Sequence, residues 1–171
     1  MKDKLKDIKL LLLDVDGVLT DGSITYTDAG EQVKSFNSRD GLGLRMLMDA
    51  GVKAGIVTGR TSQALLHRCN NLGIDLMFDG IKDKAQAFNT IVDQTGVDAR
   101  HIAFMGDDLM DLPAMTRSGL SVTVADAPVD VRAHADIITD QPGGCGAVRE
   151  ICEQILKARG DWERILSGFL S

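Results

Sequence analysis

The chain has 171 residues and a formal net charge of −6, with 44% hydrophobic and 26% charged residues. This length suits a single domain spanning residues 1–171 with a full hydrophobic core, and the composition lacks the polar bias of disordered proteins. The negative charge and the lack of Lys- and Arg-rich segments argue against nucleic-acid binding. No apolar run is long enough for a membrane span, so we expect a cytoplasmic protein without membrane partners.

Five apolar runs have the length of β-strands, and most are hydrophobic throughout, as is typical of parallel strands buried on both faces. In chain order they are 10–13, 54–57, 76–78, 102–105 and 120–124, the third being the weakest. Segments with helical spacing alternate with them at 42–48, 63–72, 84–94, 109–117 and 147–158. The alternation predicts an α/β fold, a Rossmann-like doubly wound parallel sheet.

Turn and cap residues mark several boundaries of these elements. We expect Asp40 to cap the helix over 42–48, Gly51 to end it, and Asp83 to cap the helix that begins near Lys84. Gly160 marks the start of a tail over 160–171. The predicted helices are therefore supported by both periodicity and end signals.

Directly after the first run, where a doubly wound protein normally continues into a helix, two short extended segments flank a turn over 28–30. The segments are 23–26 and 32–36, and they predict a small projecting β-hairpin, a flap over about 23–36, beside the carboxyl edge of the sheet.

Cysteine and histidine chemistry is not indicated by the sequence. The three histidines are scattered, and the three cysteines lack the close pairing of zinc or redox motifs. We interpret Cys69, Cys145 and Cys152 as reduced and mostly buried thiols, with Cys145 as a buried spacer.

Acidic, hydroxyl and basic residues cluster where the predicted strands end. They are Asp14 and Asp16 after 10–13, Thr58, Gly59 and Arg60 after 54–57, Asp107 and Asp108 after 102–105, and Lys84 at a helix start. Ligands of open α/β sheets bind outside the carboxyl ends of the strands, so these side chains are expected to converge there. Each alone is an ordinary turn or cap residue, but converging carboxylates repel one another unless a cation neutralises them.

Oxygen ligands of this kind suit Mg²⁺, with Asp14 and Asp107 as the natural direct ligands. The other groups suit phosphoryl transfer. Asp14 would attack phosphorus, and Asp16 would act as acid toward the leaving oxygen and then as base toward water. Thr58, the Gly59 amide and Lys84 would stabilise the charge on the phosphoryl oxygens.

The segments Asp14–Thr20, Thr58–Arg60, Lys84 and Gly106–Asp108 with Asp111 resemble the four motifs of the haloacid dehalogenase (HAD) superfamily, in order and over nearly the whole chain. The resemblance implies a HAD-like fold in which Asp14 is the nucleophile and Asp16 the acid/base. It also implies that Mg²⁺ is held by Asp14, Asp107 and the backbone carbonyl of Asp16. The roles of Asp108 and Asp111 stay open between support of the site and a helix start.

Within the superfamily the chain is most similar to the cap-less 3-deoxy-D-manno-octulosonate 8-phosphate phosphatase family of lipopolysaccharide biosynthesis. The similarity lies in the hairpin after Thr20-Asp21-Gly22 and in the segments 36–41 and 143–150. It implies a phosphorylated sugar-acid substrate, with Arg60 and Arg68 recognising its carboxylate and hydroxyls. It also implies a homotetramer in which hairpins and tails shape neighbouring sites.

Two alternatives remain open from the sequence. One is a phosphatase of a nine-carbon, sialic-acid-like sugar phosphate, although such relatives tend to carry an acidic residue at the position of Arg60. The other is a phosphoacceptor receiver domain of signalling. The order of residues argues against a receiver, because there the lysine comes last, whereas here Lys84 precedes Asp107.

Overall fold

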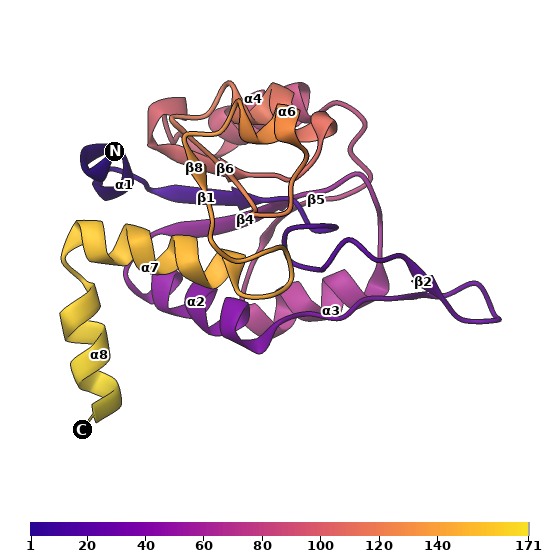
Figure 1. Ribbon diagram of the computed structural model, residues 1–171, viewed down its shortest axis with the longest axis horizontal. Helices are drawn as coiled ribbons and strands as arrows, with labels where there is room; N and C mark the ends of the chain where they lie inside the picture. The colour runs from indigo at the N-terminus through magenta and orange to yellow at the C-terminus, as the bar shows by residue number, and fades with distance from the viewer. Residues whose placement is uncertain (171) are drawn as a thin grey trace.

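The computed structural model describes residues 1–170, and its centre is a sheet of six parallel strands (Figure 1). The strands are β1 (Leu10–Leu13), β4 (Lys53–Val57), β5 (Leu76–Phe78), β6 (Ile102–Met105), β7 (Leu120–Thr123) and β8 (Ile137–Ile138). Their order in the sheet is β5-β4-β1-β6-β7-β8. The chain first runs from β1 toward β5 and then returns to the other side of β1. The direction therefore reverses at β1, which places a crevice at the carboxyl ends of β1, β4 and β6.

Helices cover both faces of this sheet, with α2, α3 and α7 on one face and α4 and α6 on the other (Figure 1). The helices are α1 (Lys2–Lys6), α2 (Ser38–Asp49), α3 (Gln63–Leu72), α4 (Lys84–Thr95), α5 (Leu112–Met115), α6 (Val129–Arg132), α7 (Ala147–Arg159) and α8 (Trp162–Leu170). Short 3₁₀ turns lie at Ala99–His101 and Leu109–Asp111. The predicted doubly wound α/β fold is confirmed.

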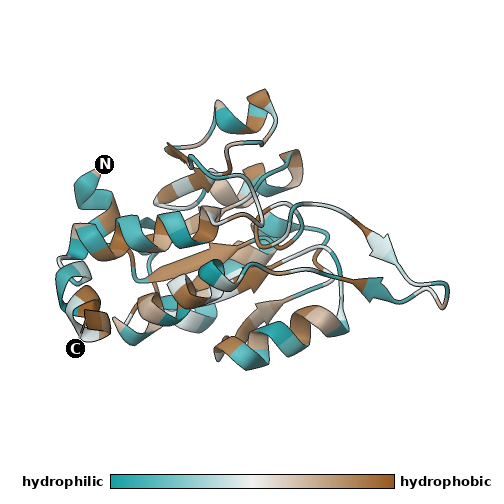
Figure 2. Cartoon of the chain, turned by 60° about the horizontal axis from the view of Figure 1, so that its bottom comes forward, coloured by the Kyte–Doolittle hydropathy of each residue, from teal (hydrophilic) through white to brown (hydrophobic). Residues whose placement is uncertain are grey.

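The core forms where the apolar strands are enclosed by the two helix layers. All four residues of β1 are fully buried, and β4 and β6 pair with them on either side. Figure 2 shows the hydrophobic sheet between helices whose outward faces are hydrophilic. The unbroken apolar runs of the sequence are thus explained by burial on both faces.

The start of α2 differs from the prediction. Asn37 is the N-cap, and its side-chain oxygen accepts a hydrogen bond from the N–H of Arg39 at 2.8 Å. Asp40 lies inside the first turn of α2 and accepts a hydrogen bond from the N–H of Arg149 in α7, also at 2.8 Å. Asp40 therefore caps a different helix from the one predicted, because α2 and α7 pack together.

Other predicted boundaries agree more closely with the structure. Asp83 caps α4 by accepting from the N–H of Gln86 at 3.0 Å. Gly51, with a φ of +86°, follows the last residues of α2. The helix expected over 109–117 is instead a 3₁₀ turn followed by the short α5, which has Pro113 in its first turn.

The predicted hairpin is confirmed, with shorter strands than expected. It consists of β2 (Thr25–Tyr26) and β3 (Gln32–Val33), paired antiparallel, and it projects beyond the sheet on the side away from α8 (Figures 1 and 2). Ile24, Tyr26 and Val33 are large apolar residues that the hairpin leaves exposed.

Beyond α7, the residues expected as a tail form the amphipathic helix α8. Trp162 and Ile165 pack against the core, whereas Leu166, Phe169 and Leu170 are exposed. Among residues 1–170, no helix has both the length and the apolar character needed to cross a bilayer. The prediction that Cys69 and Cys152 are buried is confirmed, but Cys145 is exposed and is not a buried spacer.

Candidate active site

A hollow of about 290 Å³ lies at the carboxyl ends of β1, β4 and β6. It is lined by all the predicted site residues except Arg68, namely Asp14, Asp16, Thr58, Gly59, Arg60, Lys84 and Asp107. Asp108, Met110 and Asp111 also line it. The convergence predicted from the strand ends is therefore present in the structure.

Backbone hydrogen bonds of the parallel sheet continue to Asp14 and Thr58 and fix the positions of these residues. The N–H of Asp14 donates to the carbonyl of Met105 in β6 at 2.9 Å, and the N–H of Thr58 donates to that of Phe78 in β5 at the same distance. Asp14, the candidate nucleophile, and Thr58, a candidate hydroxyl donor, thus lie directly at the ends of rigid strands. Such a position favours a precise geometry of the site.

Lys84, the first residue of α4, is the buried cation of the site. Its side chain is only 4% exposed, and its ammonium lies 2.9 Å from Asp14 Oδ1 and forms an ion pair with Asp111. Burial alone would lower the pKa of Lys84, but the charges of Asp14 and Asp111 raise it above the ordinary value. Lys84 is therefore held as a cation beside the nucleophile candidate.

Asp111 supports the site from below the surface, a role that the sequence left open. Its Oδ2 accepts hydrogen bonds from the N–H groups of Asp107 at 3.0 Å and Asp108 at 3.1 Å. Its Oδ1 pairs with Lys84, and the side chain is almost completely buried. Asp111 thus fixes both Lys84 and the loop that carries Asp107. The sequence signals for Asp111 are its place in the fourth motif of the resemblance and the capping pattern that it forms with Asp108, three residues earlier.

The carboxylates of Asp14, Asp107 and Asp111 meet closely, each offering an oxygen within 4.8 Å of the others. Oδ1 of Asp107 is buried without a hydrogen-bond partner among the described residues. Burial first, and then the charges of Asp111 and Asp14, raise the pKa of Asp107 to about 8. Burial and the Asp111 charge raise the pKa of Asp14 to about 6, although Lys84 opposes this.

Such a cluster fits a hard divalent cation, which would satisfy the orphaned oxygen and offset the repulsion. Both oxygens of Asp111 already have partners, so Asp14 and Asp107 are the side chains best placed to hold the ion. Gly17 permits this arrangement, because a Cβ there would lie 2.0 Å from Asp107 Oδ2 and its φ is +92°.

The Asp16 side chain lies between two cations. Lys34, which follows the hairpin, forms an ion pair with Oδ1 of Asp16, and Arg60 Nε lies 3.7 Å from Oδ2. Lys34 is not predicted from the sequence, because nothing in its neighbourhood indicates that the chain after the hairpin folds back toward Asp16.

Thr58 and Gly59 line the hollow next to Arg60. Thr58 is buried, and its hydroxyl lies 3.5 Å from the N–H of Arg60. The Arg60 side chain is about half exposed, so it can reach a ligand in the hollow.

Arg68 is the one predicted site residue that the fold does not bring to the hollow. Its guanidinium donates to the carbonyl of Asn37 at 3.0 Å and lies over the Phe36 ring, 5.8 Å from the ring centre. Within the single chain Arg68 secures the start of α2, and its predicted contact with substrate is not supported by this position.

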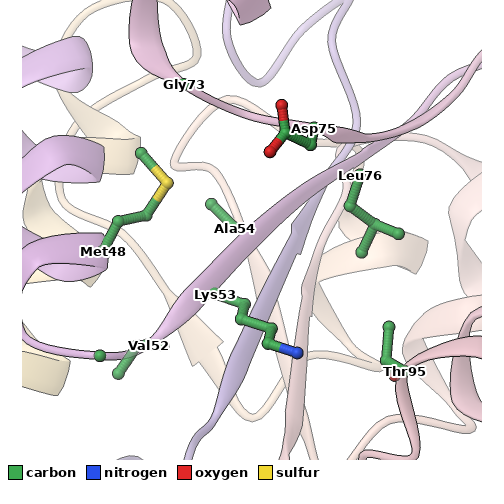
Figure 3. A pocket seen from close by; sticks show the side chains of 9 residues that line it. Met48, Val52, Lys53, Ala54, Gly73, Asp75, Leu76 and Thr95 are labelled. Atoms are coloured by element: carbon green, nitrogen blue, oxygen red, sulfur yellow. The ribbon is translucent and has the colours of Figure 1, made fainter.

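A larger cavity, of about 500 Å³, lies at the opposite edge of the sheet, at the amino ends of β4 and β5 (Figure 3). Its lining includes Met48, Lys53, Ala54, Asp75 and Leu76. A single carboxylate and a single ammonium do not make a phosphoryl-transfer site, so the smaller hollow is the candidate active site despite its size.

The sheet and this hollow define a haloacid dehalogenase-like hydrolase, and residues 74–148 match the family model of that description. The chain is 46% identical to 3-deoxy-D-manno-octulosonate 8-phosphate phosphatase from Haemophilus influenzae, over 94% of this chain and 89% of that protein.

Solved structures agree with this assignment. One is the 3-deoxy-D-manno-octulosonate 8-phosphate phosphatase from Moraxella catarrhalis in complex with magnesium ion, phosphate ion and KDO, with a TM-score of 0.96 and 40% identity over 98% of this chain and 97% of that one. Another is the cobalt-bound phosphatase from Haemophilus influenzae, with a TM-score of 0.94 and 45% identity over 98% and 99% of the two chains. The chain belongs to the 3-deoxy-D-manno-octulosonate 8-phosphate phosphatase family of the HAD superfamily.

Proposed function

We propose that the protein is a Mg²⁺-dependent phosphatase that converts 3-deoxy-D-manno-octulosonate 8-phosphate to 3-deoxy-D-manno-octulosonate and phosphate, in the cytoplasm, for lipopolysaccharide biosynthesis. The observation that carries the proposal is the hollow in which Asp14, paired with Lys84, lies beside Asp16 and Asp107. The Moraxella catarrhalis relative, which holds magnesium, phosphate and KDO, supports the choice of substrate and cofactor.

The first half of the reaction forms a phosphoaspartate. A carboxylate oxygen of Asp14 attacks phosphorus, and the bond between phosphorus and the sugar oxygen breaks. Asp16 gives a proton to that oxygen, so it leaves as the hydroxyl group of the sugar acid and not as an alkoxide. Lys84 and Thr58 are placed in the same hollow to stabilise the charge on the phosphoryl oxygens.

The second half returns the enzyme to its starting state. Asp16, now a carboxylate, takes a proton from a water molecule that attacks phosphorus. The bond between phosphorus and the Asp14 oxygen breaks, phosphate leaves, and Asp14 is again a carboxylate. Asp16 therefore serves as acid and then as base within one turnover.

Asp14, Asp107 and the backbone carbonyl of Asp16 would hold Mg²⁺, and Asp111 supports the loop that carries Asp107. When bound, the ion supplies positive charge that offsets the repulsion between the carboxylates and the phosphate. Arg60 is the residue of the hollow best suited to the sugar carboxylate, because its guanidinium is half exposed there.

The test is phosphate release from a panel of sugar phosphates, measured with the purified protein in Mg²⁺ and again in EDTA. The eight-carbon sugar-acid phosphate should have the highest kcat/KM, and EDTA should abolish its hydrolysis. A preference for a nine-carbon sugar-acid phosphate would contradict the proposed substrate. Retention of one stable phosphoryl group without turnover would instead indicate a receiver-like protein.

We also propose that the protein self-associates as a homotetramer. The support is the apolar surface of its two projecting parts: Ile24, Tyr26 and Val33 on the hairpin, and Phe169 and Leu170 on α8. Exposed apolar side chains on projecting segments can be buried against a neighbouring chain. Light scattering after size-exclusion chromatography should give four times the chain mass, and a fully active monomer would contradict the proposal.

A further inference from the structure

A buried lysine at the base of the hairpin contacts the acid/base candidate. Lys34 follows β3 directly, and its neighbours Val33 and Ser35 are exposed. The Lys34 side chain, by contrast, is only 4% exposed, and its ammonium forms an ion pair with Asp16. In this short exposed stretch, the Lys34 side chain is therefore the one that points into the protein.

An ammonium group that loses this much solvent needs a compensating charge, and Asp16 provides it. Arg60 approaches the other oxygen of the same carboxylate at 3.7 Å. Asp16 is thus held from two sides, by the chain after the hairpin and by the loop after β4. Asp16 lines the hollow whereas Lys34 does not, so Lys34 acts on the carboxylate and not on the substrate.

We propose that Lys34 is a positioning residue that fixes the Asp16 carboxylate for proton transfer and couples the hairpin to the acid/base. The inference rests on the proposed function, in which Asp16 protonates the leaving oxygen. An acid must lie within hydrogen-bond reach of the oxygen it protonates, and a displacement of about 1 Å can cost on the order of 100-fold in rate. A carboxylate that loses Lys34 keeps only the longer, half-exposed contact with Arg60.

The test uses the leaving-group dependence of the Lys34→Met variant, because methionine keeps much of the length of the side chain and removes the charge. An alkyl phosphate such as glycerol phosphate needs a proton on its leaving oxygen, whereas p-nitrophenolate leaves without one. In single-turnover experiments, the rate of ester cleavage should fall by about tenfold or more for the alkyl ester and by less than about threefold for the aryl ester. KM for both esters should change little, and Lys34→Arg should recover most of the lost rate.

Lys53→Met is the matched control, since it removes one lysine charge from the exposed start of β4 at the opposite edge of the sheet. It should leave both rates unchanged. Equal losses on the two esters in Lys34→Met would overturn the proposal and indicate damage to the fold or to phosphate binding. Unchanged rates on both would overturn it as well.

A second measurement does not depend on turnover. The thermal midpoints of Lys34→Met, Asp16→Asn and the double variant should be non-additive, and additive shifts would refute the pairing. A wild-type protein that cleaves both simple esters but not the sugar-acid phosphate would refute the proposed substrate alone, because the leaving-group test does not use that substrate.

Discussion

The side chain of Asp40 in α2 accepts a hydrogen bond from the backbone N–H of Arg149 in α7 at 2.8 Å. The carboxyl group is almost fully buried, and burial raises its pKa above the ordinary value. The Asp40 side chain thereby connects the first turn of α2 to the first turn of α7. Most strands of the sheet lie between these two helices in the sequence.

Asp40→Ala should therefore lower the free energy of unfolding by about 1–3 kcal/mol, because it leaves a buried N–H without its acceptor. Asp40→Asn keeps an acceptor oxygen and should cost less. Urea denaturation followed by circular dichroism measures both. Asp49→Ala, at the exposed end of α2, is the control and should change stability by less than about 0.5 kcal/mol. Equal effects at the two positions would contradict the capping role.

Asp14→Asn should reduce kcat by at least about 10⁴-fold while the protein stays folded, because an amide is a poor nucleophile toward phosphorus. Lys84 keeps Asp111 as its ion partner in this variant, so its burial remains compensated. Phosphate release and thermal unfolding of the same sample separate the two properties. Substantial turnover in a folded sample would place the nucleophile elsewhere.

Arg60→Ala should raise KM for the sugar-acid phosphate by about 10- to 100-fold, which corresponds to roughly 1.4–3 kcal/mol, and leave hydrolysis of an aryl phosphate nearly unchanged. Arg68→Ala should instead lower the thermal midpoint, since its guanidinium binds the carbonyl of Asn37 and packs on Phe36. A rise in KM for Arg68→Ala without loss of stability would restore its predicted role at the substrate.

Chelation of divalent cations should abolish turnover, and Asp107→Ala should raise the Mg²⁺ concentration for half-maximal activity by at least about tenfold. One oxygen of the Asp107 carboxylate has no hydrogen-bond partner in the described part of the chain. Loss of this carboxylate should therefore affect Mg²⁺ binding more than the stability of the fold. Titration of activity with Mg²⁺ measures the shift, and full activity in EDTA would refute the metal assignment.

The metal-free protein should lose stability as pH rises from about 4 to about 8, with the steepest loss below about pH 6, where both Asp14 and Asp107 contribute. The folded pKa of Asp107 is about 8 and that of Asp14 about 6, both above the ordinary carboxyl value of 3.8. Between pH 3.8 and these folded pKa values, the folded state binds more protons than the unfolded state. Stability then falls with rising pH until both groups are ionised. Urea midpoints in EDTA at several pH values should show this slope, and Asp107→Asn should flatten it. Mg²⁺ should stabilise more at pH 8 than at pH 6, because protons compete with the ion.

The fold and most of the site follow from local sequence patterns, for a physical reason. Strands buried on both faces are apolar throughout, so their ends are marked sharply by residues such as Asp14 and Thr58. Parallel topology then brings those ends together. Residues whose role depends on a segment distant in the sequence are not indicated by a local pattern of this kind. Asp40 looks like a cap for its own helix, and only the packing of α2 against α7 gives it another partner.

The same limit explains Lys34 and Arg68. Lys34 lies in an exposed stretch with no periodicity, and its burial depends on how the hairpin returns to the sheet. Arg68 has the helical spacing expected of a residue facing the hollow, but the carbonyl of Asn37 and the ring of Phe36 hold it elsewhere. Gly160 predicts the end of the helical region and the start of a tail, but it only separates α7 from the amphipathic α8.

The glycine-rich segment 143–146 lies directly against the loop that follows Asp14. The N–H of Gly144 donates to the carbonyl of Val18 at 3.0 Å, and a Cβ on Gly143 would lie 1.8 Å from the carbonyl oxygen of Gly17. During synthesis, the loop after the nucleophile leaves the ribosome before the segment that backs it, because most of the sheet lies between them in the chain. A nascent chain can therefore build much of its sheet before the catalytic loop has its final support, so phosphatase activity should appear only after residues 143–146 have left the ribosome.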